Sequence, residues 1–223
     1  MDRELLRQAL GKLLIGVLLT ALLLFLPAGT LHWWNAWLLM AVLFVPMLIA
    51  GLVMLFKAPE LLRRRLNAKE RQTEQKGVIA WSGLLFIASF LLAGFGFRFG
   101  WYMLPRAWCL LFAGVFLLGY ALFGEVLREN EYLSRTVEVT EGQRVVSTGL
   151  YGIVRHPMYF ATLLMFLSMP LILGSVYGFL VMLAYIPVLA ARIRGEESLL
   201  GRELKGYSEY KQKVRYRLIP RIW

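Results

Sequence analysis

The sequence contains very few residues of the kinds that bind metal ions or form disulfides. Among its 223 residues, Cys109 is the only cysteine, and His32 and His156 are the only histidines. One cysteine cannot form an intramolecular disulfide or a cysteine metal cluster, and two histidines are too few for a histidine-rich iron or zinc site. We therefore expect no metal centre. Cys109 lies within an apolar run and is expected to be a small packing residue.

Charged residues are also scarce. They make up 17% of the chain, whereas 59% of the residues are hydrophobic, and soluble domains contain about 45–50% apolar residues. The hydrophobic residues form long runs that a small soluble core could not bury, so lipid is their natural solvent. The net charge of +11 lies almost entirely between these runs. No basic stripe with stacking aromatic residues stands apart from the membrane flanks, and we expect no nucleic-acid partner.

The apolar runs predict an all-α integral membrane protein, a bundle of about six apolar helical segments. These segments cover residues 13–26, 33–56, 78–97, 108–127, 157–173 and 176–191. The last two have about 16 residues each, slightly fewer than the roughly 17–25 of a spanning helix, and only Gly174 and Ser175 separate them. We therefore expect a tight helical hairpin there. Pro157 suits the first turn of the first hairpin helix. Pro170 and Pro187 are expected to kink the hairpin.

Basic residues indicate which side of the membrane each connection occupies. If both termini lie on the same side, that side receives 23 of the 25 lysines and arginines, and the other side receives only Arg98 and Arg106. Cytoplasmic connections of membrane proteins carry such an excess of basic residues. The sequence therefore predicts that both termini are cytoplasmic. We expect an integral, multi-pass protein of a bacterial inner membrane.

The chain divides into two parts by composition. Residues 1–127 contain four predicted transmembrane helices, and residues 128–223 contain the hairpin and a polar tail. Residues 57–76 are expected to carry an amphipathic helical turn on the lipid head groups. The segment 136–147 predicts two short extended pieces around a turn. Glu125, near the inner end of its helix, is expected either to face the bundle interior or to reach water.

Three polar groups are expected to meet on the cytoplasmic side. They are the sequence GLYGIVRHPMY at 149–159, the pair Glu196 and Glu197 after the hairpin, and the tyrosine- and arginine-rich tail. Each alone has a simpler interpretation, because Arg155 could anchor a helix start to lipid phosphates and the glutamates could balance basic residues one turn earlier. Together they predict a pocket, since lipid anchoring alone requires neither a His-Pro helix start nor paired glutamates after a hairpin.

These motifs resemble the isoprenylcysteine carboxyl methyltransferase family and the related bacterial phospholipid methyltransferases. The resemblance rests on GLYGIVRHPMY, the hairpin, the paired glutamates and the closing GYSEYKQKVRYRLIP, and it covers the chain from about Asn130 onward. It implies methyl transfer from S-adenosylmethionine, as a carboxyl O-methyltransferase. It also implies that residues 128–223 are the catalytic region and that the active site faces the cytoplasm. The implied acceptor is a lipophilic or lipidated molecule, either an isoprenylcysteine-like carboxylate or a lipid head group. Membrane lipids are the other implied partners.

The resemblance also implies roles for individual residues. The implied donor-binding positions are His156, Tyr159, Glu196, Glu197, Gly149, Leu150 and Tyr151. The implied catalytic positions are Arg155, Arg217 and His156. The arginines suit a carboxylate or phosphate on the acceptor. A carboxylate acceptor is already ionised at pH 7 and needs no base, whereas an amine acceptor needs one, for which His156 or a glutamate is the candidate.

Two other hypotheses stay open at this point. The closing segment also resembles that of membrane sterol reductases, which use NADPH, although their additional polar motifs are absent from this sequence. The chain could also be a non-catalytic, lipid-binding membrane scaffold in which the charged clusters hold head groups. Binding of a methyl donor, of a nicotinamide nucleotide, or of neither separates the three hypotheses.

Overall fold

Helices make up nearly all of the regular structure in the computed structural model, which describes residues 3–67, 73–130, 132 and 142–223. In chain order they are α1 (Arg3–Ala28), α2 (Trp34–Lys57), α3 (Pro59–Asn67), α4 (Thr73–Arg98), α5 (Arg106–Glu129), the 3₁₀ turn η1 (Gly149–Gly152), α6 (Pro157–Ile172), α7 (Val176–Met182), α8 (Tyr185–Glu203) and α9 (Tyr207–Lys213). The β-type pairing in these described ranges is one isolated bridge between Met103 and Ser175. The predicted all-α class is confirmed.

Five helical stretches in the described part of the chain are long and apolar enough to cross a membrane. They are α1, α2, most of α4, α5, and α7 together with α8. The apolar helix α6 is shorter, with 16 residues. Large apolar side chains on the long helices are exposed, such as Leu26 and Trp81, as expected where lipid replaces water. The structure thus has the multi-pass architecture that the hydropathy of the chain predicts.

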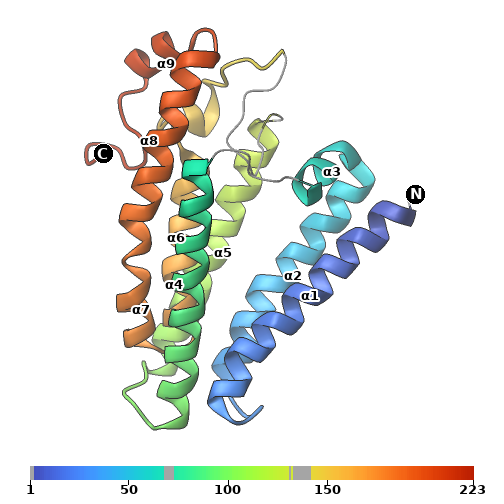
Figure 1. Ribbon diagram of the computed structural model, residues 1–223, viewed down its shortest axis with the longest axis vertical. Coiled ribbons are helices and arrows are strands. Elements are labelled where there is room, and N and C mark those ends of the chain that lie inside the picture. The colour runs from blue at the N-terminus through green and yellow to red at the C-terminus, as the bar shows by residue number, and fades with distance from the viewer. Residues whose placement is uncertain (1–2, 68–72, 131, 133–141) are drawn as a thin grey trace.

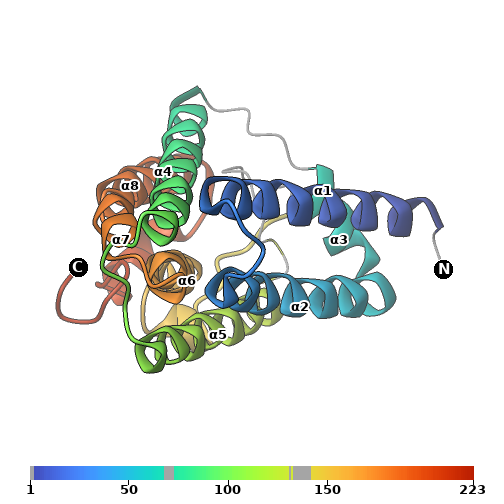
Figure 2. The ribbon, with the colours of Figure 1, turned by 90° about the horizontal axis from the view of Figure 1, so that it is seen from below.

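The short helix α6 lies inside the bundle. Figure 2 shows α6 between α5 and the group of α4, α7 and α8, with α1 and α2 as a pair beside them. Helix α5 approaches α6 closely because it carries Gly119, where a Cβ would lie 2.7 Å from Met165 Cγ and 3.0 Å from the Ala161 carbonyl oxygen. Small residues allow membrane helices to pack in this way. At the end of α6, the Asn35 side chain donates to the Ile172 carbonyl at 2.9 Å.

The polar segments gather at one end of the bundle. In Figure 1 the start of α1, α3, η1 and α9 lie towards the upper end, whereas the α1–α2 and α4–α5 connections lie at the lower end. The hairpin of α6 with α7 and α8 leaves this end and returns to it. As a result, the motif before α6 and the glutamate pair on α8 come to the same end of the molecule.

The predicted hairpin forms, but its second arm differs from the prediction. This arm consists of two helices, α7 and α8, separated at Leu183 and Ala184. Pro187 lacks the N–H that would bond to the Leu183 carbonyl, and that carbonyl accepts from the Ile186 N–H at 3.1 Å instead. The predicted end of this arm at residue 191 is wrong, because α8 continues to Glu203. Hydropathy marks where a helix leaves the apolar layer, and it does not mark where the helix ends.

The smaller expectations have different outcomes. The predicted amphipathic turn is the helix α3, whose Leu62 is buried. Glu125 reaches outward, since its side chain is 39% exposed and pairs with Arg128 at 2.5 Å. Cys109 is buried in the bundle, as a packing residue should be. The extended pieces predicted at 136–147 fall largely outside the described residues.

Candidate functional site

A clamped turn precedes α6. Gly149 opens η1 with a φ of 53°, in the left-handed region that favours glycine. The Glu129 carboxylate at the end of α5 accepts from the Leu150 N–H with both oxygens, at 3.0 and 3.1 Å. A Cβ at position 149 would fall 1.7 Å from Glu129 Oε1. The turn therefore needs glycine both for its conformation and for the space that the carboxylate occupies.

Tyr151 in the same turn is fixed from two directions. Its hydroxyl accepts from Asn130 Nδ2 at 3.0 Å, and its carbonyl accepts from the Tyr210 hydroxyl at 2.8 Å. Burial raises the pKa of Tyr151 to about 12, and it also raises the pKa of Tyr210. Both phenols are therefore neutral at pH 7 and serve as hydrogen-bonding groups.

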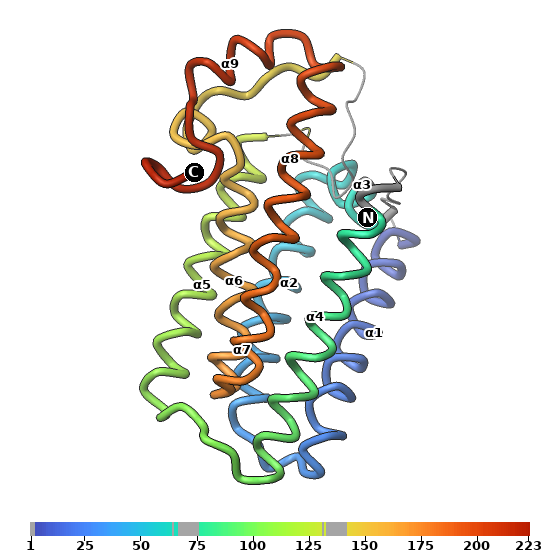
Figure 3. The backbone as a smooth tube through the Cα atoms, turned by 60° about the vertical axis from the view of Figure 1, so that its left-hand side comes forward, coloured from blue at the N-terminus to red at the C-terminus, as the bar shows by residue number. Residues whose placement is uncertain are grey.

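The C-terminal tail pairs with the entry to α6. The backbone N–H of Arg155 donates to the Tyr216 carbonyl, and that of His156 donates to the Arg217 carbonyl, each at 2.9 Å. Pro157 then begins α6, at a position where a missing N–H leaves no partner unpaired. Figure 3 shows the tail, in red, beside the segment that leads from η1 into α6. The C-terminal tail and the GLYGIVRHPMY motif lie far apart in the sequence, and they lie side by side in the structure.

Glu197 is the centre of a buried charge cluster. Its Oε1 accepts from Arg155 Nε at 2.6 Å and lies 3.3 Å from His156 Nε2, and its Oε2 accepts from Arg217 Nε at 2.9 Å. The Glu197 side chain is only 3% exposed. Arg155 also donates to the carbonyls of residues 214 and 215, both at 2.7 Å. Buried charges persist only when paired and hydrogen-bonded, so this cluster ties α8, the α6 entry and the tail together.

Glu196, one residue earlier on α8, points elsewhere. Its Oε2 accepts from the Tyr159 hydroxyl at 2.5 Å, and the same hydroxyl accepts from Arg192 Nε at 3.0 Å. With 3.6 residues per turn, adjacent helix positions project about 100° apart. The pair is therefore divided, with Glu197 in the buried cluster and Glu196 at a pocket.

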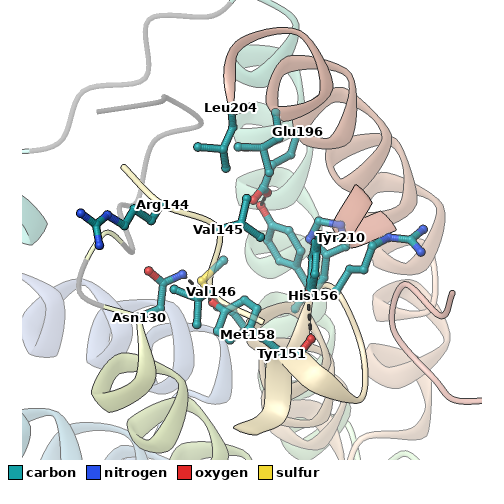
Figure 4. Close-up of a pocket in the computed structure, with 13 residues that line it drawn as sticks. Asn130, Arg144, Val145, Val146, Tyr151, His156, Met158, Glu196, Leu204 and Tyr210 are labelled. Atoms are coloured by element: carbon teal, nitrogen blue, oxygen red, sulfur yellow. Dashed lines mark hydrogen bonds between the residues drawn. The ribbon is translucent and has the colours of Figure 1, made fainter. Parts of the chain in front are cut away.

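This pocket opens at the polar end of the bundle. Figure 4 shows it among the end of α5, the strip 144–146, η1, α6, α8 and α9. The enclosed part of its volume is about 70 Å³, and the volume is about 510 Å³ when the part open to solvent is included. Its lining consists of Asn130, Arg144, Val145, Val146, Tyr151, Arg155, His156, Met158, Tyr159, Glu196, Leu200, Leu204 and Tyr210.

Five of the predicted site residues line this pocket, namely Tyr151, Arg155, His156, Tyr159 and Glu196. The other four lie outside the lining. Gly149 and Leu150 shape the η1 turn. Glu197 and Arg217 lie in the buried cluster, where the Glu197 carboxylate accepts from both Arg155 and Arg217. The fold thus brings the predicted residues together, five in the pocket lining and four in the adjacent turn and buried cluster.

Sequence reasoning missed three residues that build the site. Asn130 and Tyr210 line the pocket, and Glu129 holds the η1 turn. Tyr210 belongs to the closing motif, so its position in that motif is a signal that could have identified it. Asn130 and Glu129 form an ordinary polar helix end in the sequence, and no local pattern distinguishes them.

The pocket offers a carboxylate, neutral phenols and an imidazole to a ligand. Arg155 faces the pocket but is bound to Glu197, and Figure 4 shows the Arg144 guanidinium directed away from the other lining residues. Carboxylates and tyrosine faces attract cations and bind hydroxyl groups. Among the residues that the structure describes, no three His, Cys, Asp or Glu side chains gather closely enough to hold a metal ion. A cationic organic ligand with hydroxyl groups fits this lining.

Comparison with known proteins points to a class of enzyme. Residues 106–205 match the family model of phospholipid methyltransferase. A solved structure of the eukaryotic intramembrane Ras methyltransferase ICMT (isoprenylcysteine carboxyl methyltransferase) shares the fold, with a TM-score of 0.50 at 16% sequence identity, covering 98% of this chain and 96% of that chain. A Delta(14)-sterol reductase, TM7SF2 of Mus musculus, is 31% identical over 91 residues, which are 40% of this chain. The chain spans 22% of the length of that relative.

The family match over residues 106–205 supports a methyltransferase, and the five long apolar helices support a membrane protein. The resemblance expected from the sequence is confirmed to this extent: residues 106–205 match the phospholipid methyltransferase model, and the fold is shared with the isoprenylcysteine carboxyl methyltransferase structure. The matched region begins with α5 and ends just after α8. It therefore contains the GLYGIVRHPMY motif, the whole hairpin and both glutamates, and all of the pocket lining except Tyr210.

Proposed function

We propose that this chain transfers a methyl group from S-adenosylmethionine to a lipophilic acceptor at the cytoplasmic face of the membrane. The observation that carries the proposal is the pocket of η1, α6 and α8, which lies within the matched region where the apolar bundle meets the polar end. S-adenosylmethionine supplies a methyl group already activated on a sulfonium. The protein has to orient the reactants and exclude water, for which proximity contributes up to roughly 7–11 kcal/mol.

The lining residues are assigned to the donor by their chemistry. Glu196 offers a carboxylate to hydroxyl groups or a cation, and the Tyr151 ring is of a kind that suits a sulfonium. The Tyr159 ring already contacts the Arg192 guanidinium, which lies 5.9 Å from its centroid. His156 lies in the same lining. Glu197 has a different proposed role from Glu196, because it is enclosed by basic groups. It holds His156 and the tail in place and acts on the donor through them.

The acceptor is a carboxylate of the isoprenylcysteine kind or a lipid head-group amine. A carboxylate is ionised at pH 7 and attacks without a base. An amine must lose a proton, and His156 is the candidate base. Arg155 and Arg217 donate to Glu197 in the structure, so they are available to an acceptor only through their remaining N–H groups.

Transfer of a radiolabelled methyl group tests this function and separates the two acceptor classes. The purified protein is assayed in detergent with a prenylated cysteine derivative, with phosphatidylethanolamine and with a total membrane lipid extract. We expect label in the organic phase; base-labile label is a methyl ester, and base-stable label is an N-methyl group. Glu196→Gln should lose most of the label while keeping its melting temperature, since Glu196 is not part of the buried cluster. Absence of label with all three acceptors contradicts the proposal.

The sterol reductase alternative rests on a short match. The aligned residues make up 40% of this chain and 22% of the reductase, whereas the shared methyltransferase fold extends over 98% of this chain. Measurement of NADPH binding separates the two hypotheses directly.

Cysteine labelling tests the proposed cytoplasmic placement. Because Cys109 is buried, it should give little background with a membrane-impermeant maleimide. Ser208 on α9 and His32 before α2 are both exposed, at opposite ends of the bundle. We expect His32→Cys to be labelled in intact spheroplasts and Ser208→Cys only after permeabilisation. The reverse pattern contradicts a cytoplasmic site.

A further inference from the structure

The end of the chain folds back into a closed hook. A main-chain oxygen of Trp223 accepts from three successive backbone N–H groups, those of Arg217 at 2.9 Å, Leu218 at 3.0 Å and Ile219 at 3.3 Å. The N–H of Trp223 donates to the Ile219 carbonyl at 3.1 Å, and Arg221 has a positive φ of 65°. Successive N–H groups that converge on one oxygen form a concave binding site called a nest. Residues 217–223, the C-terminal hook, are therefore a fixed structure.

The indole of Trp223 lies against the guanidinium of Arg217. The distance from Arg217 Cζ to the ring centroid is 5.2 Å, within the range of about 6 Å for cation–π contacts. On its other side, Arg217 donates from Nε to Glu197 at 2.9 Å. A guanidinium that is held on one face by an aromatic ring and on one edge by a carboxylate has little rotational freedom.

The hook is also anchored in the bundle. Leu218 is buried in the apolar cluster that contains Tyr159 and Leu189, and the Trp223 side chain packs against the same cluster. The carbonyl of Arg217 accepts from the His156 N–H at 2.9 Å. Trp223 is thereby linked, through the side chain and the backbone of one arginine, to Glu197 and to a residue of the pocket lining.

We propose that Trp223 is a positioning residue for the donor pocket, acting through Arg217 on Glu197 and His156. This inference rests on the proposed function for its meaning, because the pocket it supports is the donor site. The indole sets the orientation of Arg217, which keeps the Glu197 carboxylate paired, and the hook sets the backbone of Arg217 to which His156 is bonded. Nothing in this role requires Trp223 to touch the donor.

Two substitutions separate the aromatic face from the bulk of the side chain. Trp223→Phe keeps a face for Arg217, and Trp223→Leu keeps apolar volume without one. By titration of the full-length protein in detergent with S-adenosylmethionine, we expect Trp223→Phe within about twofold of the wild type and Trp223→Leu weaker by about threefold to tenfold, the range of a partly buried cation–π contact. Trp81→Leu, at a 62% exposed tryptophan of α4, should bind as the wild type does.

A second measurement does not depend on the donor. The melting temperature of Trp223→Phe should exceed that of Trp223→Leu, and this difference should vanish in an Arg217→Gln background, because the contact partner is then absent. If the wild type binds no donor, the proposed function fails. The contact between Trp223 and Arg217 is then tested by the melting temperatures alone. Equal melting temperatures of the Phe and Leu variants, or a difference that survives Arg217→Gln, overturn the positioning role.

Discussion

Replacement of Glu197 by glutamine is expected to lower both the stability of the protein and its affinity for the donor. The glutamine has nearly the same shape but no charge, so Arg155 and Arg217 lose their counter-ion. The Arg155 side chain is only 4% exposed and cannot recover that loss from water. Removal of one partner of a buried ion pair costs about 3–5 kcal/mol, and the α6 entry and the tail should separate together.

The neighbouring glutamate supplies the matched control for this prediction. Glu196→Gln makes the same chemical change one residue away, but Glu196 contacts the Tyr159 hydroxyl and lies outside the Glu197 cluster. We expect Glu196→Gln to have the melting temperature of the wild type and a lower affinity for the donor. Glu197→Gln should have both a lower melting temperature and a lower affinity. Melting is followed by circular dichroism in detergent. A Glu197→Gln protein that melts at the wild-type temperature contradicts the assigned role of the cluster.

Gly149→Ala is the second substitution for which a large effect is expected. The left-handed conformation costs a non-glycine residue about 1–2 kcal/mol, and the new Cβ would also overlap the Glu129 carboxylate, at 1.7 Å from Oε1. The turn must shift, and Tyr151 shifts with it. Because a displacement of about 1 Å in a site costs roughly 100-fold in rate, we expect methyl transfer to fall by at least about tenfold.

A second glycine tests whether that effect is local. Gly201 lies on α8, and a Cβ there would meet nothing within 4 Å. Gly201→Ala should therefore keep full activity and gain slightly in stability, since alanine is the better helix former by about 1 kcal/mol. Glu129→Ala combined with Gly149→Ala should restore part of the activity, because it removes the overlap but not the strained conformation. Wild-type activity in Gly149→Ala alone contradicts the clamped-turn geometry.

The fold was predictable to the extent that it depends on hydropathy. The thickness of the lipid layer sets the length of an apolar run that spans it, and this length predicts the long helices that the structure contains. The end of α8 was not predictable in this way, because residues 192–203 are polar and leave the membrane while remaining helical. The two-helix form of the second hairpin arm was signalled only by Pro187, which predicts a break but not its position.

The site was predictable as a group of residues but not as a geometry. The motif residues indicated that Glu196 and Glu197 act near His156. Which glutamate faces the pocket depends on the rotation of α8 about its axis, and that rotation depends on packing against distant segments such as α4. The bonds from Glu129 to Leu150 and from Asn130 to Tyr151 join the end of α5 to η1. Such contacts depend on how the helices are packed, and no local pattern reports them.

The most direct test of the central claim is a calorimetric titration of the wild-type protein in detergent with S-adenosylmethionine, S-adenosylhomocysteine and NADPH. Glu196→Gln is titrated in parallel. The structure and the family match predict saturable binding of the first two ligands, weakened in the variant, and no binding of NADPH. Binding of NADPH without the methyl donor would indicate the reductase, and absence of binding by all three would indicate a non-catalytic scaffold. Either result contradicts a methyltransferase pocket at η1, α6 and α8.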